Sequence, residues 1–213
     1  APHLDDLQCV YGCLEGFLGA KPSSSVPILA VFDNEETGSL SKQGADSTFL
    51  EDVLKRISLA SGKDEEGHYR VVSSSFMVSA DNAHAVHPNH PEKADPINRP
   101  MINKGIVIKF NAAQHYTTDA VSCAVYRDLC ESNDIPVQVF TNRSDTRGGS
   151  TLGNVSNAHV SLNTVDIGLA QLAMHSCYET VGARDTKYLV EAMTIFYSKT
   201  FRVDAGGSFE LLD

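Results

Sequence analysis

The sequence predicts an α/β fold, a three-layer α/β/α sandwich built around a mostly parallel or mixed sheet. Apolar segments of strand length alternate with segments whose apolar residues recur at helical spacing, and no internal repeat is present. This alternation is typical of layered domains in which helices cover the faces of a sheet. In such sheets ligands bind beyond the carboxyl ends of the strands, so the polar loops that follow strands are where a site is expected.

The first part of the chain predicts a helix, a buried strand and a second helix. A helix is expected over 7–19, where apolar residues recur at helical spacing as Leu7, Val10, Leu14 and Leu18. The uninterrupted apolar run Val26–Phe32 predicts a strand buried in the sheet. Polar capping residues then predict a helix that starts near Asp46 and runs to Ala60.

The remaining elements continue the alternation of strands and helices. A polar loop is expected at 61–68, and a segment rich in His, Pro and Asn covers 81–100. Strand-like segments are predicted at 71–80, 105–110, 136–141 and 160–167. Helices are predicted at 117–133 and 186–201, with a Gly-rich loop at 142–153 and a short helix before the last strand.

The bulk composition fits one domain and argues against several classes of partner. A chain of 213 residues with a formal net charge of −10 and no Lys/Arg run is unsuited to binding nucleic acid. Its apolar runs, such as Val26–Phe32 and Ile106–Phe110, are too short to span a membrane. The five cysteines lack CxxC spacing, which predicts free, buried thiols and a cytoplasmic protein.

The first residues suggest that further sequence precedes them. Ala1 stands where an initiator Met is usual, and motif-like residues follow at once from Leu4. Residues 1–6 resemble neither a signal peptide nor a targeting segment. We therefore expect an upstream part of the protein.

Two acidic pairs lie where a cation or a proton would offset their charge. Asp5 and Asp6 lie at the start of the first helix, where capping and the helix dipole offer an alternative explanation. Glu35 and Glu36 follow the predicted strand, and a solvated acidic turn is their alternative. Neighbouring residues outside a helix point in different directions, so one Glu can bind a metal while the other faces a reacting water.

Metal-type ligands also gather at two later places. Asp81 lies within ten residues of His84, His87 and His90, without the spacing or the cysteines of a zinc finger. Chance clustering in a surface loop is the alternative for this group. His175 stands beside apolar residues, and a satisfied core or interface histidine is its alternative.

Together these residues predict a site for two divalent cations. Asp5 suits a bridging carboxylate, because a short side chain at a helix start holds a fixed geometry. A two-metal site lowers the pKa of a bridging water to about 7 and polarises a carbonyl. A free Glu would then move the proton from the water to the leaving amine.

Several segments resemble the M18 family of zinc aminopeptidases, the aspartyl aminopeptidases. These segments are Phe32–Ser39 (FDNEETGS) with Gly44–Ser47, Met77–Asn89 (MVSADNAHAVHPN) and Leu172–Ser176 (LAMHS). The resemblance extends from Leu4 to about Phe201. It implies the zinc-peptidase, phosphorylase/hydrolase-like fold, with residues 1–213 forming a metallopeptidase catalytic domain, the C-terminal portion of a longer family architecture.

The resemblance assigns roles to the candidate metal ligands. Asp5 would bridge two zinc ions, Glu36 and His175 would complete one metal site, and Asp81 would serve the other. Glu35 would be the general acid/base that activates the bridging water. Mn²⁺ or Co²⁺ are alternatives to zinc, because carboxylate-rich two-metal sites also accept them.

The resemblance also implies a substrate and an assembly. His84 and Lys109 would contact substrate, and the loop Asp145–Thr151 resembles the Gly-rich loop near the family's site. The implied substrate is a peptide with an N-terminal Asp or Glu, whose side chain suits charge-assisted contacts. The implied assembly is a homo-oligomer, a dodecamer in the resembled family.

Two features of the family are missing from these residues. One is an upstream His-Thr-Asp-Ser-Pro-like motif, whose His binds the second metal, and the other is an inserted dimerisation domain. Without that His the second metal would keep only Asp5 and Asp81, fewer than the three protein ligands typical of catalytic zinc. Two alternatives therefore stay open: a catalytically incomplete assembly or scaffold protein, and a related zinc carboxypeptidase or deacylase.

Overall fold

The predicted α/β fold around a mixed sheet is confirmed. A computed structural model describes residues 1–146, 148–204 and 206–212. Its main sheet has four strands in the order β1-β5-β3-β4. The strands are β1 (Phe76–Ala80), β5 (Asn163–Gly168), β3 (Ile106–Phe110) and β4 (Val137–Thr141). β1 runs parallel to β5, β3 runs parallel to β4, and β3 is antiparallel to β5, so the sheet is mixed.

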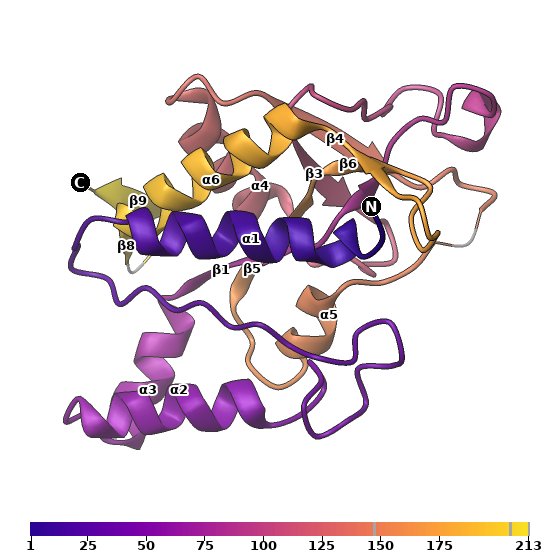
Figure 1. The fold of residues 1–213 in the computed structure, drawn as a ribbon. Coiled ribbons are helices and arrows are strands. Elements are labelled where there is room, and N and C mark those ends of the chain that lie inside the picture. The colour runs from indigo at the N-terminus through magenta and orange to yellow at the C-terminus, as the bar shows by residue number, and fades with distance from the viewer. Residues whose placement is uncertain (147, 205, 213) are drawn as a thin grey trace.

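Three helices cover one face of this sheet, namely α1 (Leu4–Gly19), α4 (Ala120–Glu131) and α6 (Ala183–Ser198) (Figure 1). The core between them is built from β3 and β5 residues such as Ile106 and Ile167 and from helix residues such as Tyr126 and Leu189. The short α5 (Leu152–Asn157) contacts β1 and β5, where Gly153 lies against the Ser79 side chain.

Smaller elements complete the fold. A second sheet has the order β2-β6-β7 and consists of β2 (Ala83–His84), β6 (Ala170–Leu172) and β7 (Thr180–Val181). A hairpin of β8 (Thr200–Val203) and β9 (Phe209–Leu212) follows α6. The remaining elements are α2 (Phe49–Ala60), α3 (Glu65–Ser73) and the 3-10 helix η1 (Pro91–Lys93). Two predictions were therefore wrong where they overlap α3. The loop expected at 61–68 and the β-like segment expected at 71–80 both include residues of this helix, which begins after the capping residue Asp64.

The buried face of α1 is formed by Gln8, Cys9, Gly12, Cys13 and Gly16 rather than by its leucines. Gly12 and Gly16 lie against α6, where a Cβ on Gly12 would come within 2.6 Å of the Leu189 side chain. Leu7, Leu14 and Leu18 are exposed. The predicted helix is confirmed, and its glycines allow the two helix backbones to approach closely.

Replacing Gly16 by Ala is expected to destabilise the protein by about 1–3 kcal/mol, because overpacking a tight contact forces side chains and backbone apart. The added Cβ would lie 2.5 Å from the Met193 Cβ and 2.9 Å from backbone atoms of Met193 and Thr194. Urea unfolding measures the effect. Gly19→Ala on the same helix is the control, since its Cβ would meet Thr194 at an ordinary 3.5 Å; equal unfolding midpoints would contradict the prediction.

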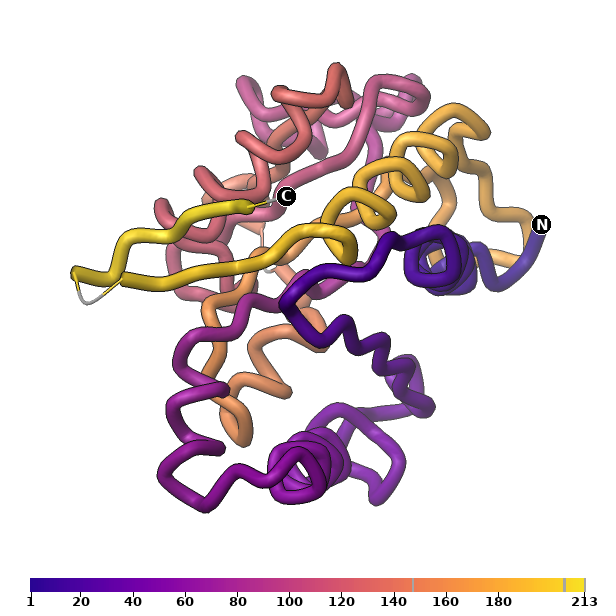
Figure 2. Tube along the Cα trace, turned by 90° about the vertical axis from the view of Figure 1, so that its left-hand side faces the viewer, coloured from indigo at the N-terminus to yellow at the C-terminus, as the bar shows by residue number. Residues whose placement is uncertain are grey.

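The buried strand expected at Val26–Phe32 was wrong. The structure leaves this segment without strand pairing, and most of its side chains are exposed. Figure 2 shows the segment passing from the end of α1 toward α2 and α3, away from the sheet. A strand needs a neighbour that accepts its backbone hydrogen bonds, and within the described residues this segment has none.

Candidate metal centre and active site

The fold brings four of the predicted site residues to one end of the main sheet. Asp81 directly follows β1, Asp5 lies at the start of α1, and His175 lies in the turn between β6 and β7. The Nε2 atom of His175 lies 3.1 Å from Asp5 Oδ2 and 3.2 Å from Glu36 Oε2. Three ligand atoms from distant parts of the chain therefore converge on one point.

The turn that carries the two glutamates has a defined backbone. Asn34 and Gly38 both adopt positive φ angles, 69° and 127°. The Gly38 amide donates to the carbonyl of Asn34 at 2.8 Å, which closes a tight turn around Glu35 and Glu36. Adjacent residues in such a turn direct their side chains differently. This geometry separates Glu36, which meets His175, from Glu35.

Asp5 has the environment of a ligand whose charge needs a partner. Its side chain is only 4% exposed, and its Oδ1 atom is buried without a hydrogen-bond partner in the described structure. Burial, followed by the charges of Asp81 and Glu36, raises the pKa of Asp5 to about 8. A buried carboxylate among other carboxylates favours protonation or a bound cation. The donor set of two carboxylates and one imidazole fits zinc.

A second group of carboxylates adjoins the first. Oxygens of Asp5, Asp6 and Asp81 lie within 4.8 Å of one another. Burial, and then the charge of Asp81, raises the pKa of Asp6 well above its usual value. In the sequence, Asp6 is recognisable only as half of an acidic pair. Its place in this group follows from the loop after β1, where the Asn82 amide donates to Asp6 Oδ1 at 3.1 Å.

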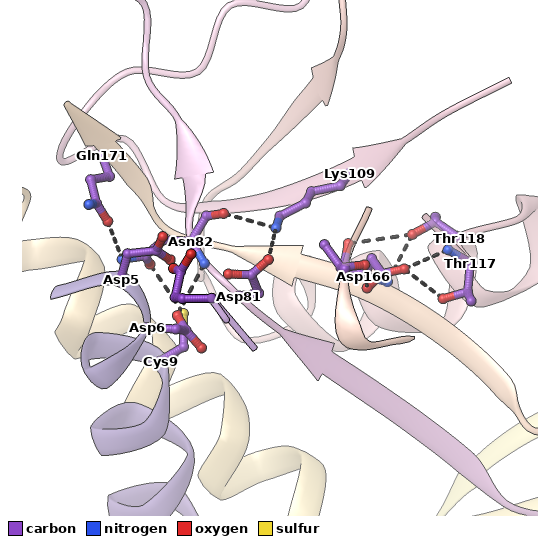
Figure 3. Close-up of polar contacts among 12 residues, drawn as sticks. Asp5, Asp6, Cys9, Asp81, Asn82, Lys109, Thr117, Thr118, Asp166 and Gln171 are labelled. Atoms are coloured by element: carbon purple, nitrogen blue, oxygen red, sulfur yellow. Dashed lines mark hydrogen bonds and ion pairs between the residues drawn. The ribbon is translucent and has the colours of Figure 1, made fainter. Parts of the chain in front are cut away.

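Lys109 is directed at the carboxylates from within β3. Its side chain is buried, and its ammonium contacts Asp81 Oδ2 at 3.2 Å and the Asn82 carbonyl at 2.9 Å (Figure 3). Burial lowers the pKa of Lys109, but the nearby carboxylates, Asp81 foremost, raise it above its usual value on balance. Lys109, predicted to contact substrate, thus also holds Asp81 in place.

Asn82 links the start of α1 to the residues after β1 and to β6 through hydrogen bonds. Its side-chain amide donates to the Leu4 carbonyl, to Gln8 Oε1 and, at 2.6 Å, to Gln171 Oε1. Its own Oδ1 accepts from the Cys9 thiol at 3.2 Å (Figure 3). These bonds hold Asp5 and Asp6 against the end of β1. Nothing in the sequence singled out Asn82 beyond its place in the motif.

Glu179 is a second residue whose role in the site is not predictable from the sequence. Its buried carboxylate accepts backbone N–H groups from Leu4 at 2.6 Å, Asp5 at 3.2 Å and His175 at 2.8 Å. Burial raises the pKa of Glu179, but these N–H groups lower it below its usual value on balance. Glu179 therefore fixes the backbone of two candidate ligands at once. An isolated Glu has no sequence pattern that would reveal this function.

A pocket of about 420 Å³ opens beside the carboxylates. Glu35, His84, Lys109 and His175 all line it, together with residues of the loop 142–151. The Gly-rich loop expected at Asp145–Thr151 therefore contributes Thr146 and residues 148–151 to the pocket lining. Arg147 of this loop lies outside the described residues.

Two further residues of the pocket, Glu35 and His84, have shifted pKa values. Desolvation, followed by the charges of Asp81 and Glu36, raises the pKa of Glu35. Desolvation and the positive charges of Lys109 and His175 lower the pKa of His84. A carboxylate with a raised pKa beside candidate metal ligands is suited to accept and return a proton.

The family model described as "Aminopeptidase I zinc metalloprotease (M18)" matches residues 1–197. The chain belongs to the M18 family. A probable M18 family aminopeptidase 2 from Clostridium acetobutylicum is 52% identical over 195 residues, which cover 92% of this chain and 45% of that protein. This M18 chain therefore spans about half the length of the curated relatives it matches.

Solved structures agree with this assignment. A chain in the cryo-EM structure of the Ape4 and Nbr1 complex superposes with a TM-score of 0.88 at 37% identity, over 93% of this M18 chain and 39% of that chain. A chain of the S. cerevisiae mApe1 dodecamer superposes with a TM-score of 0.78 at 29% identity, over 92% of this M18 chain and 45% of that chain. Among the described residues of this family member, no helix has the length and apolarity to cross a membrane.

Proposed function

We propose that the protein acts as a zinc-dependent aminopeptidase, a hydrolase that removes the N-terminal residue of a peptide. The observation that carries the proposal is the convergence of Asp5, Glu36 and His175, with Asp5 buried and short of a partner. A relative of 52% identity bears the name of a probable M18 aminopeptidase. Residues 1–213 would contribute a catalytic domain, as the C-terminal portion of a longer architecture.

Two groups of this chain's residues would hold the metal ions. Asp5, Glu36 and His175 would hold one zinc, and Asp81 and Asp6 would hold the other, with Asp5 shared between them. Bound zinc supplies a lowered pKa to a coordinated water and polarisation to a carbonyl. Lys109 offsets part of the remaining negative charge through its contact with Asp81. Mn²⁺ or Co²⁺ would be accepted by the same oxygen-rich set.

Glu35 would carry the proton in the reaction. It lines the pocket beside the ligands without belonging to either group of converging atoms. Its raised pKa lets the carboxylate take a proton from the attacking water and return it to the leaving amine. Adjacent Glu36 is engaged with His175, so the pair divides into one base and one ligand.

The pocket favours an acidic N-terminal side chain in the substrate. Besides the carboxylates of the candidate ligands, Glu35 and Asp95, its lining carries the cationic side chains of Lys93, Lys109 and Arg143, together with His84. Cationic groups recognise a carboxylate through charge-assisted hydrogen bonds. We therefore expect Asp and Glu to be removed faster than Ala or Lys. We also expect the protein to work in the cytoplasm, as a homo-oligomer like the dodecameric relative.

Hydrolysis of aspartyl, glutamyl, alanyl and lysyl chromogenic amides, each with and without a chelator, tests the proposal. Turnover of the acidic amides that stops with the chelator and returns with zinc would support it. Cleavage of peptides from their carboxyl end would instead support the carboxypeptidase alternative. Binding of zinc without hydrolysis of any of the four amides would contradict the proposed activity.

Replacing Glu179 by Gln is expected to weaken zinc binding by about 10–100-fold, because residues that only orient metal ligands have effects of this size. Gln keeps the shape of the side chain but loses the charge that accepts N–H groups of Asp5 and His175. Isothermal titration with zinc measures the change. Glu66→Gln, on the exposed first turn of α3, is the control; equal affinities in both variants would contradict the orienting role.

A further inference from the structure

Asp166 is a buried carboxylate that lies outside both groups of converging ligands and has no part in the proposed proton transfer. It belongs to β5 and is only 1% exposed, and Asp is seldom buried so fully without partners. The next residue, Ile167, packs in the core beneath the helices. Because successive side chains of a strand alternate, Asp166 points to the opposite face of the sheet. Accordingly, a Cβ on Gly153 of α5 would come within 2.8 Å of Asp166 Oδ1.

The two oxygens of this carboxylate hold two segments that are far apart in the sequence. Oδ2 accepts hydrogen bonds from the Thr117 backbone N–H at 2.5 Å and from the Thr117 hydroxyl at 2.7 Å (Figure 3). Oδ1 accepts a hydrogen bond from the Thr151 hydroxyl at 2.7 Å. The backbone N–H of Asp166 also donates to Thr118 Oγ1 at 2.9 Å. One buried side chain therefore links the segment before α4 to the residue before α5.

Both segments form walls of the pocket beside the candidate metal centre. Thr151 lines the pocket at the end of the Gly-rich loop. Tyr116, the residue before Thr117, lines it as well, and its ring centroid lies 5.5 Å from the Lys109 ammonium. Asp166 itself lies behind these walls rather than at the pocket surface. It can therefore act on a bound molecule only through the residues that it holds.

We propose that Asp166 is a positioning residue for substrate binding, which holds Tyr116 and the end of the Gly-rich loop in the arrangement that receives the N-terminal residue of the peptide. Loops that must become ordered on binding lower the affinity, whereas a pocket that is already ordered avoids this cost. Asp166 supplies this order through Thr117 and Thr151. The inference deepens the proposed aminopeptidase function and rests on it for the identity of the substrate.

Asp185 offers a comparison within the same fold. It is as fully buried as Asp166, and it accepts the backbone N–H groups of Asn103 at 2.6 Å and Gly105 at 2.9 Å. These bonds join the first turn of α6 to the turn before β3, and none of the three residues lines the pocket. Asp185 is therefore a buried aspartate that supports the fold without holding a pocket wall.

Asp166→Asn is expected to raise the KM for an aspartyl amide at least about 10-fold and to change kcat less than about 3-fold, because a loss confined to substrate binding appears in KM. Asn has a similar size but only one acceptor oxygen, so it cannot accept hydrogen bonds from Thr117 and Thr151 together. Asp185→Asn is the matched control. It should lower the thermal midpoint without raising KM; an equal rise in KM in both variants would overturn the proposal.

Thr151→Val tests the same contact with a smaller disturbance, since it removes only the hydroxyl that Asp166 Oδ1 accepts. It should also raise KM, and the double variant with Asp166→Asn should have no higher KM than Asp166→Asn alone, because residues in contact are not additive. The control is Thr164→Val on the same strand, where the buried hydroxyl donates to the Leu162 carbonyl at 3.0 Å, away from the pocket. Fully additive effects would contradict the action of Asp166 through Thr151.

Hydrogen exchange followed by mass spectrometry gives a second readout that needs no turnover. Exchange in the peptides that contain Thr117 and Thr151 should be at least about 10-fold faster in Asp166→Asn than in the unmodified protein, and unchanged in Asp185→Asn, because lost hydrogen bonds allow local opening. If no amide is hydrolysed but exchange changes in this way, the proposed peptidase activity fails while Asp166 still holds the pocket walls. Faster exchange without a rise in KM in an active protein, or unchanged exchange, would overturn the proposal.

Discussion

Replacing Glu35 by Gln is expected to reduce peptide hydrolysis by about 10²–10⁴-fold, the usual contribution of a general acid/base. The zinc content of the protein should stay nearly unchanged. Glu35 lines the pocket beside the ligands, but neither group of converging ligand atoms includes it. Gln has the same shape and can still donate a hydrogen bond, but it cannot take a proton from water. Amide hydrolysis and zinc per chain are measured on the same preparation.

The neighbouring glutamate provides the control for this experiment. Glu36→Gln removes a carboxylate that lies 3.2 Å from His175 Nε2, so it should lose zinc and activity together. The two variants differ by one position and carry the same chemical change. If Glu35→Gln hydrolyses the amide at the normal rate, the proposed mechanism is wrong. If it loses zinc as Glu36→Gln does, Glu35 is a ligand and not the base.

Replacing His175 by Ala is expected to remove zinc binding at the first site and activity with it. The imidazole is the only nitrogen ligand among Asp5, Glu36 and His175. Removing this imidazole should weaken zinc binding by more than about 10–100-fold, which is the effect of removing a residue that only orients a metal ligand. Zinc binding stabilises the folded state by about 2.7 kcal/mol at 100 times the dissociation constant. The rise in thermal midpoint on adding zinc should therefore be smaller in His175→Ala than in the unmodified protein, because the first site no longer contributes to it.

His87→Ala is the matched control for this prediction. His87 lines the same pocket and is exposed, but its ring does not belong to the converging ligands. The zinc-dependent rise in thermal midpoint should remain in this variant. An unchanged rise in His175→Ala would mean that zinc binds elsewhere, and the assignment of Asp5 and Glu36 as its ligands would fail with it.

Local sequence patterns predicted most elements because those elements depend on their own residues. The apolar run of β3 and the periodic residues of α6 were recognised within a few positions of their observed bounds. The segment Val26–Phe32 has an equally strong strand pattern, yet it is unpaired. A strand, unlike a helix, needs hydrogen-bond partners from another segment. The pattern of Val26–Phe32 therefore indicates a preference for strand structure, but the described residues supply no hydrogen-bond partner for it.

The residues of the candidate site were likewise predicted only in part. Adjacent acids at Glu35 and Glu36 predicted a cation site because their repulsion needs an explanation, and the resemblance to M18 enzymes then named the partners. Asn82 and Glu179 escaped notice, since each acts by receiving or donating hydrogen bonds to backbone groups remote in sequence. Single polar residues with such roles leave no periodic or clustered signal.

The sequence by itself determined the types of ligand, the strand and helix preferences and the family of the chain. These properties depend on residue identity and on spacing along the chain. Only the tertiary structure decided that Asp5, Glu36 and His175 meet, that Lys109 turns to Asp81, and that Asp166 joins Thr117 to Thr151. Charge interactions and hydrogen bonds act over a few ångströms of space, so they depend on how distant segments pack.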